Sequence, residues 1–185
     1  IKFNIEGEGR HIINVGASTL QALPALTDPN TTIDATTQNG YGENGSFEPQ
    51  IILDGSGTFW IAPWNALWIR ANNCAVYGLE IRNFPDDGID VTSANNVTIG
   101  AAGKGNVIYN CGAEQDFWEV INPRGPWEGC GIVVKGGSLN TTISGNILGT
   151  NYNRDLNTGN EFCGINVSGA SNNLVIGGDT PAAGN

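Results

Sequence analysis

Short stretches of alternating apolar and polar residues recur along the chain. They are rich in Val, Ile and Thr, and they are separated by Gly, Asn, Asp and Ser. Strict alternation is typical of β-strands, because successive side chains of a strand point to opposite faces. The best helical candidate, residues 17–26, is a turn or two long and has no clear cap. The pattern therefore predicts an all-β chain with few or no helices.

One phrase, Gly-Ile-x-Val, is repeated at 88–91, 131–134 and 164–167, and each copy is followed by an Asn and a second apolar stretch. A fainter copy begins at Leu67. Internal repetition of about 20–50 residues indicates a solenoid. Superposing the copies places three isoleucines in one inward column: Ile89, Ile132 and Ile165.

The repeats differ in length, so the excess residues must leave them as loops. The sequence predicts three such excursions, at 38–49, 112–129 and 150–162. Insertions of this kind often carry the binding surface of a repeat protein. We expect 1–185 to form a single domain. Because both ends fall within a repeat, we also expect it to be a fragment or ordered core of a longer protein.

The repeats resemble those of right-handed parallel β-helix proteins, a family of secreted and surface-exposed bacterial proteins. The resemblance is carried by Gly-Asn-Ile-Leu-Gly-Thr at 145–150 and by the stretch Asn-Asn-Leu-Val-Ile-Gly-Gly-Asp-Thr-Pro at 172–181. The openings at 1–5 and 31–35 are also similar, so it covers nearly the whole chain. It implies a right-handed parallel β-helix and an extracellular or cell-surface location. It says little about activity, because this scaffold carries lyases, hydrolases, adhesins and structural proteins alike.

Charge narrows the possible partners. The net charge is −10, only 14% of the residues are charged, and there is no basic run. Nucleic-acid binding needs Lys and Arg to neutralise phosphates, so a nucleic-acid partner is not expected. No apolar run approaches the ~18 residues of a membrane-spanning helix, so none is predicted. An acidic balance fits a salt-exposed or cation-binding protein.

The cysteines suggest a cross-link. Cys130 and Cys163 each precede the repeated Gly, so we expect them on neighbouring strands, about 5 Å apart and within reach of a disulfide. Cys111 could instead pair with Cys130 and clamp the 112–129 loop. Oxidised pairing would fit an extracellular protein. Among the Asn-x-Ser/Thr sequons, Asn44 lies in a Gly-rich loop and is the best glycosylation candidate.

The sharpest candidate for chemistry is an acidic corner formed by Asp86, Asp87 and Asp90, under the base of the 112–129 loop. Aromatic rings stack on sugars, and paired carboxylates either hydrolyse a glycosidic bond or hold Ca²⁺. A solvated loop without a ligand is the alternative. The loop adds these candidate side chains: Glu114, Asp116, Trp118, Glu119, Arg124, Trp127 and Glu128.

Two further features bear on function. The pair Asp86-Asp87 is similar to the paired aspartates of pectin-cleaving β-helix hydrolases, but the Arg-Ile-Lys triplet and a nearby histidine are missing. Trp68 stands between Leu67 and Ile69 and should therefore point outward. There it could stack on a sugar or pack against a loop or another copy of the chain.

We therefore expect an extracellular or cell-surface structural and binding module, such as part of an adhesin, sheath or filament. Its partner would be a polysaccharide, a cell-surface glycan, or copies of itself stacked through their ends. The alternative is a polysaccharide lyase or glycoside hydrolase acting on an acidic polysaccharide. Its catalytic candidates are Asp86, Asp87, Asp90 and Arg124.

Overall fold

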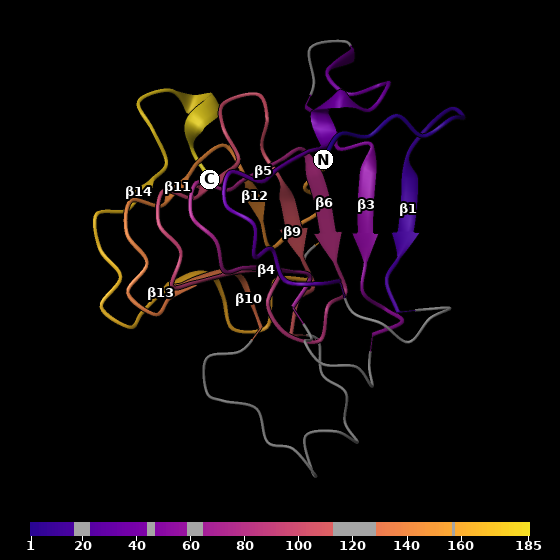
Figure 1. Cartoon of the computed structure of the whole chain (residues 1–185). Coiled ribbons are helices and arrows are strands. Elements are labelled where there is room, and N and C mark those ends of the chain that lie inside the picture. Colours follow the sequence, from indigo (N-terminus) through magenta and orange to yellow (C-terminus); the bar gives the residue numbers. More distant parts are fainter. Residues whose placement is uncertain (17–22, 44–46, 59–64, 113–128, 157) are drawn as a thin grey trace.

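The computed structural model describes residues 1–16, 23–43, 47–58, 65–112, 129–156 and 158–185 (Figure 1). Within these ranges the chain is built from short strands, with two 3₁₀ turns, η1 (Ala35–Thr37) and η3 (Pro181–Ala183). The strands are β1 (His11–Asn14), β2 (Thr32–Asp34), β3 (Ile51–Asp54), β4 (Leu67–Ile69), β5 (Ala75–Tyr77), β6 (Leu79–Arg82), β7 (Ile89–Thr92), β8 (Thr98–Ile99), β9 (Val107–Tyr109), β10 (Cys130–Lys135), β11 (Thr142–Ile143), β12 (Ile147–Leu148), β13 (Cys163–Val167) and β14 (Val175–Ile176).

These strands form three parallel sheets (Figure 1). Sheet 1 has the order β1-β3-β6-β9-β12, sheet 2 the order β13-β10-β7-β4, and sheet 3 the order β14-β11-β8-β5-β2. Strands that follow one another along the chain, such as β4, β5 and β6, belong to different sheets, and neighbours within a sheet come from successive repeats. The all-β prediction is confirmed. Within the best helical candidate, 17–26, residues 23–26 are not helical, and 17–22 lie outside the described residues.

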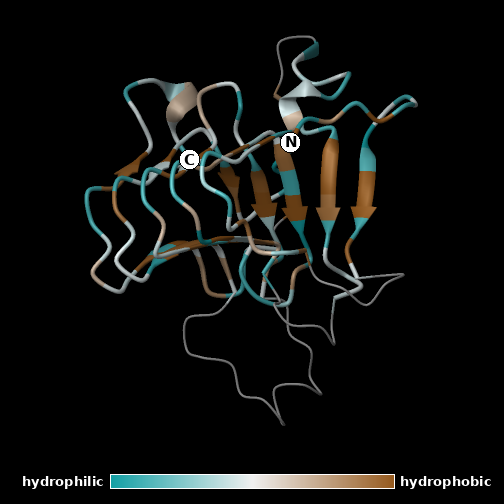
Figure 2. Cartoon of the chain, in the orientation of Figure 1, coloured by the Kyte–Doolittle hydropathy of each residue, from teal (hydrophilic) through white to brown (hydrophobic). Residues whose placement is uncertain are grey.

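The core lies between the three sheets and consists of the inward residues of each strand. Ile89 pairs with Ile132, and Ile132 pairs with Ile165, as the superposed repeats predict. Ile89 and Ile132 are completely buried. Burying a side chain of this size contributes roughly 1.5–3 kcal/mol, so a column repeated on every sheet supplies the main driving force for folding. Figure 2 shows the strands as the most hydrophobic segments of the chain.

Asparagines stack at one corner of the molecule. Five of them have left-handed backbones, with φ between 55° and 63°. The side-chain amide of each donates to the side-chain oxygen of its predecessor, at 3.1 Å for the first pair and 2.9 Å for the next two. Asn tolerates this backbone better than other residues with a side chain. The Asn that follows each repeated phrase thus belongs to a ladder, which Asn30 extends. Its members are Asn30, Asn73, Asn96, Asn140 and Asn173.

A second ladder is buried. The side chain of Asn106 accepts from the backbone N–H of Leu79 at 3.1 Å and donates to Asn146 at 3.0 Å. Asn146 donates to Asn185 at 2.9 Å. The preceding Gly105 is required because a Cβ there would lie 1.7 Å from the carbonyl oxygen of Gly145. The ladder therefore fixes how closely successive repeats approach.

Two of the predicted loops cover the outer face of sheet 1. Phe47, from the 38–49 loop, and Tyr152, from the 150–162 loop, meet edge to face with ring centroids 5.6 Å apart. Both pack against the outward side chains Val107, Tyr109 and Ile147. The third predicted loop, 112–129, lies outside the described residues except for its two end residues.

Candidate functional site

Asp87 holds the start of β10 in place. Its Oδ1 accepts hydrogen bonds from the backbone N–H groups of Gly129 at 3.1 Å and Cys130 at 2.8 Å. Its own backbone N–H donates to Oδ1 of Asn65 at 3.2 Å. The carboxylate is almost completely buried, at 2% exposure. Asp87 therefore stabilises the backbone at the point where the chain returns from the 112–129 loop.

Asp90 is the centre of a polar network on the outer face of sheet 2. Its Oδ2 lies 2.8 Å from Nζ of Lys135 and accepts from Nδ2 of Asn65 at 3.3 Å. Its Oδ1 accepts from the hydroxyl of Thr92. Asp90 is 1% exposed, whereas the Lys135 side chain is 43% exposed. The network therefore presents an ammonium group to solvent above a buried carboxylate.

Trp68 continues this face on the neighbouring strand. Trp68 pairs with Asp90 in register and points outward between the buried Leu67 and Ile69, as predicted. Its indole N–H is 3.4 Å from the hydroxyl of Thr92, and the guanidinium of Arg70 lies 4.8 Å from its ring centroid. A cation over an indole ring is a favourable contact. Within the described part of the chain, no carboxylate lies within 4.0 Å of the Arg70 guanidinium.

The pKa values of Asp87 and Lys135 both lie above their usual values. Burial raises the pKa of Asp87 to about 7, and the neighbouring charge of Asp86 adds to the rise. Burial lowers the pKa of Lys135, but the hydrogen bond to Asp90 and the nearby charges of Asp90, Asp87 and Asp86 together outweigh it, so the pKa lies above its usual value. At neutral pH the site therefore contains a partly protonated acid beside a fully charged amine.

Calcium binding at Asp86, Asp87 and Asp90 stays a prediction. No group of three His, Cys, Asp or Glu side chains converges among the residues that the structure describes. The reason is that Asp87 already accepts from two backbone N–H groups, while Asp90 is engaged by Lys135.

Several predicted site residues cannot be placed. The side chains expected to bind or act on a sugar from the 112–129 loop lie outside the described residues, as does the glycosylation candidate Asn44. The structure therefore places Trp68 and Asp90 side by side on sheet 2, with Asp86 and Asp87 in the turn just before β7. The unplaced loop residues are Glu114, Asp116, Trp118, Glu119, Arg124, Trp127 and Glu128.

The cysteines follow the predicted register. Cys130 pairs with Cys163 across β10 and β13, and a hydrogen bond joins their sulfur atoms. Cys111 instead lies in the core, where burial raises the pKa of its thiol to about 12. All four cysteines, including Cys74, are free thiols in this structure. The register thus favours Cys163 over Cys111 as the partner of Cys130, and the disulfide itself stays a prediction.

A second charged network lies on the outer face of sheet 1 and was not predicted from the sequence. Glu80 is 1% exposed and accepts from Nη1 of Arg82 at 3.2 Å, from the hydroxyl of Tyr109 at 3.0 Å, and from Arg10. Nε of Arg82 also binds Asp54 at 2.9 Å. One feature of the sequence could have indicated this network: the repeats place Glu80 in an outward column beside two apolar residues, Val107 and Ile147. Such a column predicts a covered face.

Comparison with protein-family models, with curated proteins and with solved structures found no match for this chain. In the described ranges, no helix has the length and apolar character needed to cross a membrane.

Proposed function

We propose that the three parallel sheets are the walls of a right-handed parallel β-helix. Two observations support this. Successive strands of the chain belong to different sheets, and each sheet takes one strand from each repeat. Connections between parallel strands of one sheet are right-handed in about 98% of cases. The asparagine ladders and the repeated phrases fit the family that the sequence resembles.

We further propose that this β-helix is an extracellular or cell-surface module that binds a glycan on the outer face of sheet 2. The observation that carries the proposal is the group formed by Trp68, Arg70, Thr92, Asp90 and Lys135. It joins a half-buried aromatic ring to hydrogen-bonding and charged groups on rigid strands. Sugar rings use such a combination, because their C–H faces stack on aromatic rings while their hydroxyls bind polar groups.

Binding is tested by titrating the protein with a panel of neutral and acidic polysaccharides and following heat release. Trp68→Ala is expected to abolish binding. The matched control is Tyr77→Ala, which removes an aromatic–cation pair from sheet 3, where Lys104 lies 5.7 Å from the Tyr77 ring centroid. Equal losses in both variants, or no binding across the panel, would refute the proposed site.

A second candidate is hydrolysis of a glycosidic bond by the aspartates of the same corner. It is favoured by the raised pKa of Asp87 beside Asp86 and Asp90, since an acid and a base of different pKa are what glycosidases use. A reducing-sugar and unsaturated-product screen tests it. Asp86→Ala and Asp90→Asn should lose turnover but keep the fold, and absence of turnover in the unmodified protein would exclude the candidate.

A further inference from the structure

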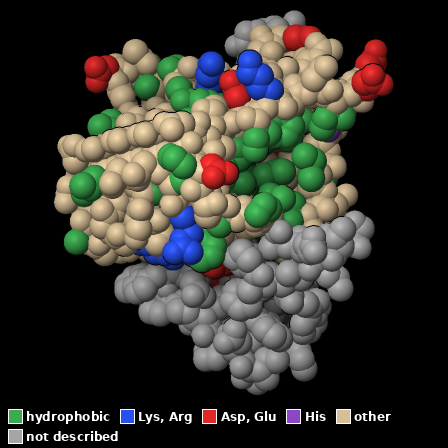
Figure 3. Space-filling model, in the orientation of Figure 1, with side chains coloured by type: hydrophobic (Ala, Val, Ile, Leu, Met, Phe, Trp, Pro, Cys, Tyr) green, Lys and Arg blue, Asp and Glu red, His purple; other side chains and the backbone are tan. Residues whose placement is uncertain are grey.

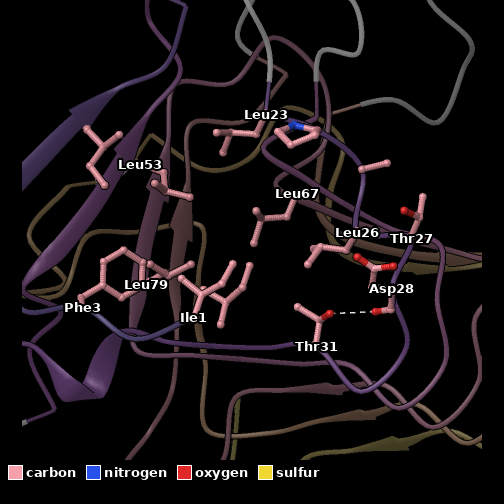
Figure 4. A pocket seen from close by; sticks show the side chains of 14 residues that line it. Ile1, Phe3, Leu23, Leu26, Thr27, Asp28, Thr31, Leu53, Leu67 and Leu79 are labelled. Atoms are coloured by element: carbon pink, nitrogen blue, oxygen red, sulfur yellow. Dashed lines mark hydrogen bonds between the residues drawn. The ribbon is translucent and has the colours of Figure 1, made fainter.

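A cavity of about 360 Å³ lies at the end of the core nearest the N-terminal segment (Figure 4). Every sheet contributes inward side chains to its walls: Ile13, Leu53 and Leu79 of sheet 1, Leu67 of sheet 2 and Ile33 of sheet 3. Leu23 and Leu26 approach the cavity from the connection before β2. Figure 3 shows hydrophobic side chains gathered around a hollow on this side of the molecule. The cavity is thus walled partly by strands of the core and partly by the segments that precede β2, and it opens to solvent.

The size and lining of this cavity suit an apolar guest. A cavity of about 150 Å³ lined by Leu, Ile and Phe stays dry and takes up benzene. The present cavity has more than twice that volume and a similar lining, and it reaches the lower limit of small-ligand sites, about 300 Å³. Removing an alkyl chain from water into such a space is favourable by about 0.8 kcal/mol per methylene group.

The polar groups of the cavity lie together on one side. Asp28 and Thr31 are neighbours there (Figure 4), and the Thr31 hydroxyl donates to the backbone carbonyl of Asp28 at 2.7 Å. Asp28 is exposed, so its carboxylate faces solvent at the mouth. No Lys or Arg side chain is found among the described residues that line the cavity. Asp28 is thus the one charged side chain among the described residues that line the cavity, and a cationic group is the one that it would attract.

A second copy of the chain fits this cavity less well. The opposite end of the molecule exposes Val175 and Ile176, each 53% exposed, which could enter an apolar hollow. However, residues 163–185 contain Asp179 and no Lys or Arg. Such a copy would bring a further carboxylate toward Asp28 and no cation to balance it.

We infer that the cavity binds a small cationic amphiphile, with its alkyl chain among Leu23, Leu53 and Leu67 and its head group beside Asp28. This site is separate from the outer face of sheet 2 and does not depend on glycan binding.

Calorimetric titration with octylammonium tests the inference, with octanoate and octanol as comparators. Octylammonium should bind most tightly. Asp28→Asn should lower its affinity about two- to fivefold, the effect of an exposed ion pair, and leave octanol unchanged. Leu23→Trp, which fills the cavity, should remove binding of both. Ile176→Ser, at the far end, is the control for adsorption on exposed apolar residues and should change nothing.

The results that would overturn the inference are equally definite. Octanoate binding as tightly as octylammonium would exclude the cationic head group. Binding lost in Ile176→Ser as much as in Leu23→Trp would show surface adsorption. Sedimentation that reveals dimers, which both Leu23→Trp and Ile176→Ser dissociate, would assign the cavity to a second copy. Circular dichroism of each variant checks its fold, and Asp28→Asn, a surface change, keeps the test valid if Leu23→Trp does not fold.

Discussion

The outer faces of sheets 1 and 2 carry similar residues, but these residues are covered on sheet 1 and partly exposed on sheet 2. On sheet 1, Glu80 is bound by Arg82 and Tyr109, and an aromatic cluster that includes Phe47 and Tyr152 packs beside it. On sheet 2, Asp90 is equally buried, but its partner Lys135 and the nearby Trp68 remain partly exposed. Both faces pair an acid with a cation beside an aromatic residue.

The difference shows when an outward polar residue stabilises the fold and when it can belong to a binding site. On sheet 1, aromatic rings from two inserted loops pack against the outward apolar column, and the charged side chains pair with one another. On sheet 2 the described residues leave an indole, a guanidinium and an ammonium group within reach of solvent. A covered face stabilises the fold, whereas a partly open one can bind a ligand. The following experiments test that contrast.

The largest effect is expected from Glu80→Gln. The substitution leaves two arginines around a neutral side chain in a buried position, and we expect a loss of about 3 kcal/mol in the free energy of unfolding, measured by urea denaturation. Asp90→Asn is the matched change on sheet 2. It should cost about 1 kcal/mol, because solvent screens Lys135. Equal losses of stability in the two variants would show that the covered and the partly open face do not differ in this respect.

Oxidation should join Cys130 to Cys163 and stabilise the end of sheet 2. The two residues are register partners on adjacent strands, and a disulfide closing this loop would contribute about 2 kcal/mol. Peptide mapping after treatment with a thiol oxidant identifies the cross-link. Cys111→Ser should leave it intact and Cys163→Ser should remove it. A Cys111–Cys130 product would show that the register does not decide the pairing.

The aspartates of the two faces should give opposite pH dependences. The folded pKa of Asp87 lies above its unfolded value, so its contribution is present at acid pH and lost as the pH rises through about 7. Burial raises the pKa of Asp54, but hydrogen bonds from Asn83, Ser56 and Arg82 outweigh it and lower the pKa. The contribution of Asp54 is therefore present above its unfolded pKa and lost as the pH falls through the lower folded value.

Asp87→Asn isolates the first of these effects. Its side-chain oxygen can still accept from Gly129 and Cys130, so we expect about 1 kcal/mol more stability at pH 8 than in the unmodified protein and little difference at pH 5. Urea denaturation at the two pH values measures it. A variant that is less stable at pH 8 would show that Asp87 is needed as an anion.

The smallest change in stability is expected for Trp68→Ala, about 0.5 kcal/mol, because the side chain is only partly buried and part of it is already in contact with water. Tyr152→Ala on sheet 1 should cost about twice as much, since it uncovers apolar residues and removes a ring contact. Glycan binding should show the reverse order, with a larger loss in Trp68→Ala than in Tyr152→Ala. A large loss of stability in Trp68→Ala would mean that this face is also structural.

Much of the architecture could be predicted from the repeats. The isoleucine columns, the Asn corner and the alignment of Cys130 with Cys163 all follow from laying repeated phrases over one another, because parallel pairing keeps equivalent residues adjacent. The network of Glu80 with Arg10 could not be predicted. These residues are 70 positions apart and carry no shared pattern, so their meeting depends on how a loop and a strand pack.

The sequence by itself determined the all-β composition and the pairing register, since both are local or repeated properties of the chain. It also identified the acidic corner, but assigned it calcium or catalysis. Only the tertiary structure decided that Asp87 binds the backbone at the start of β10 and that Asp90 neutralises Lys135. It also decided which sheet face is covered. Contacts between distant segments settle these points, because they determine which charges are buried and which remain in water.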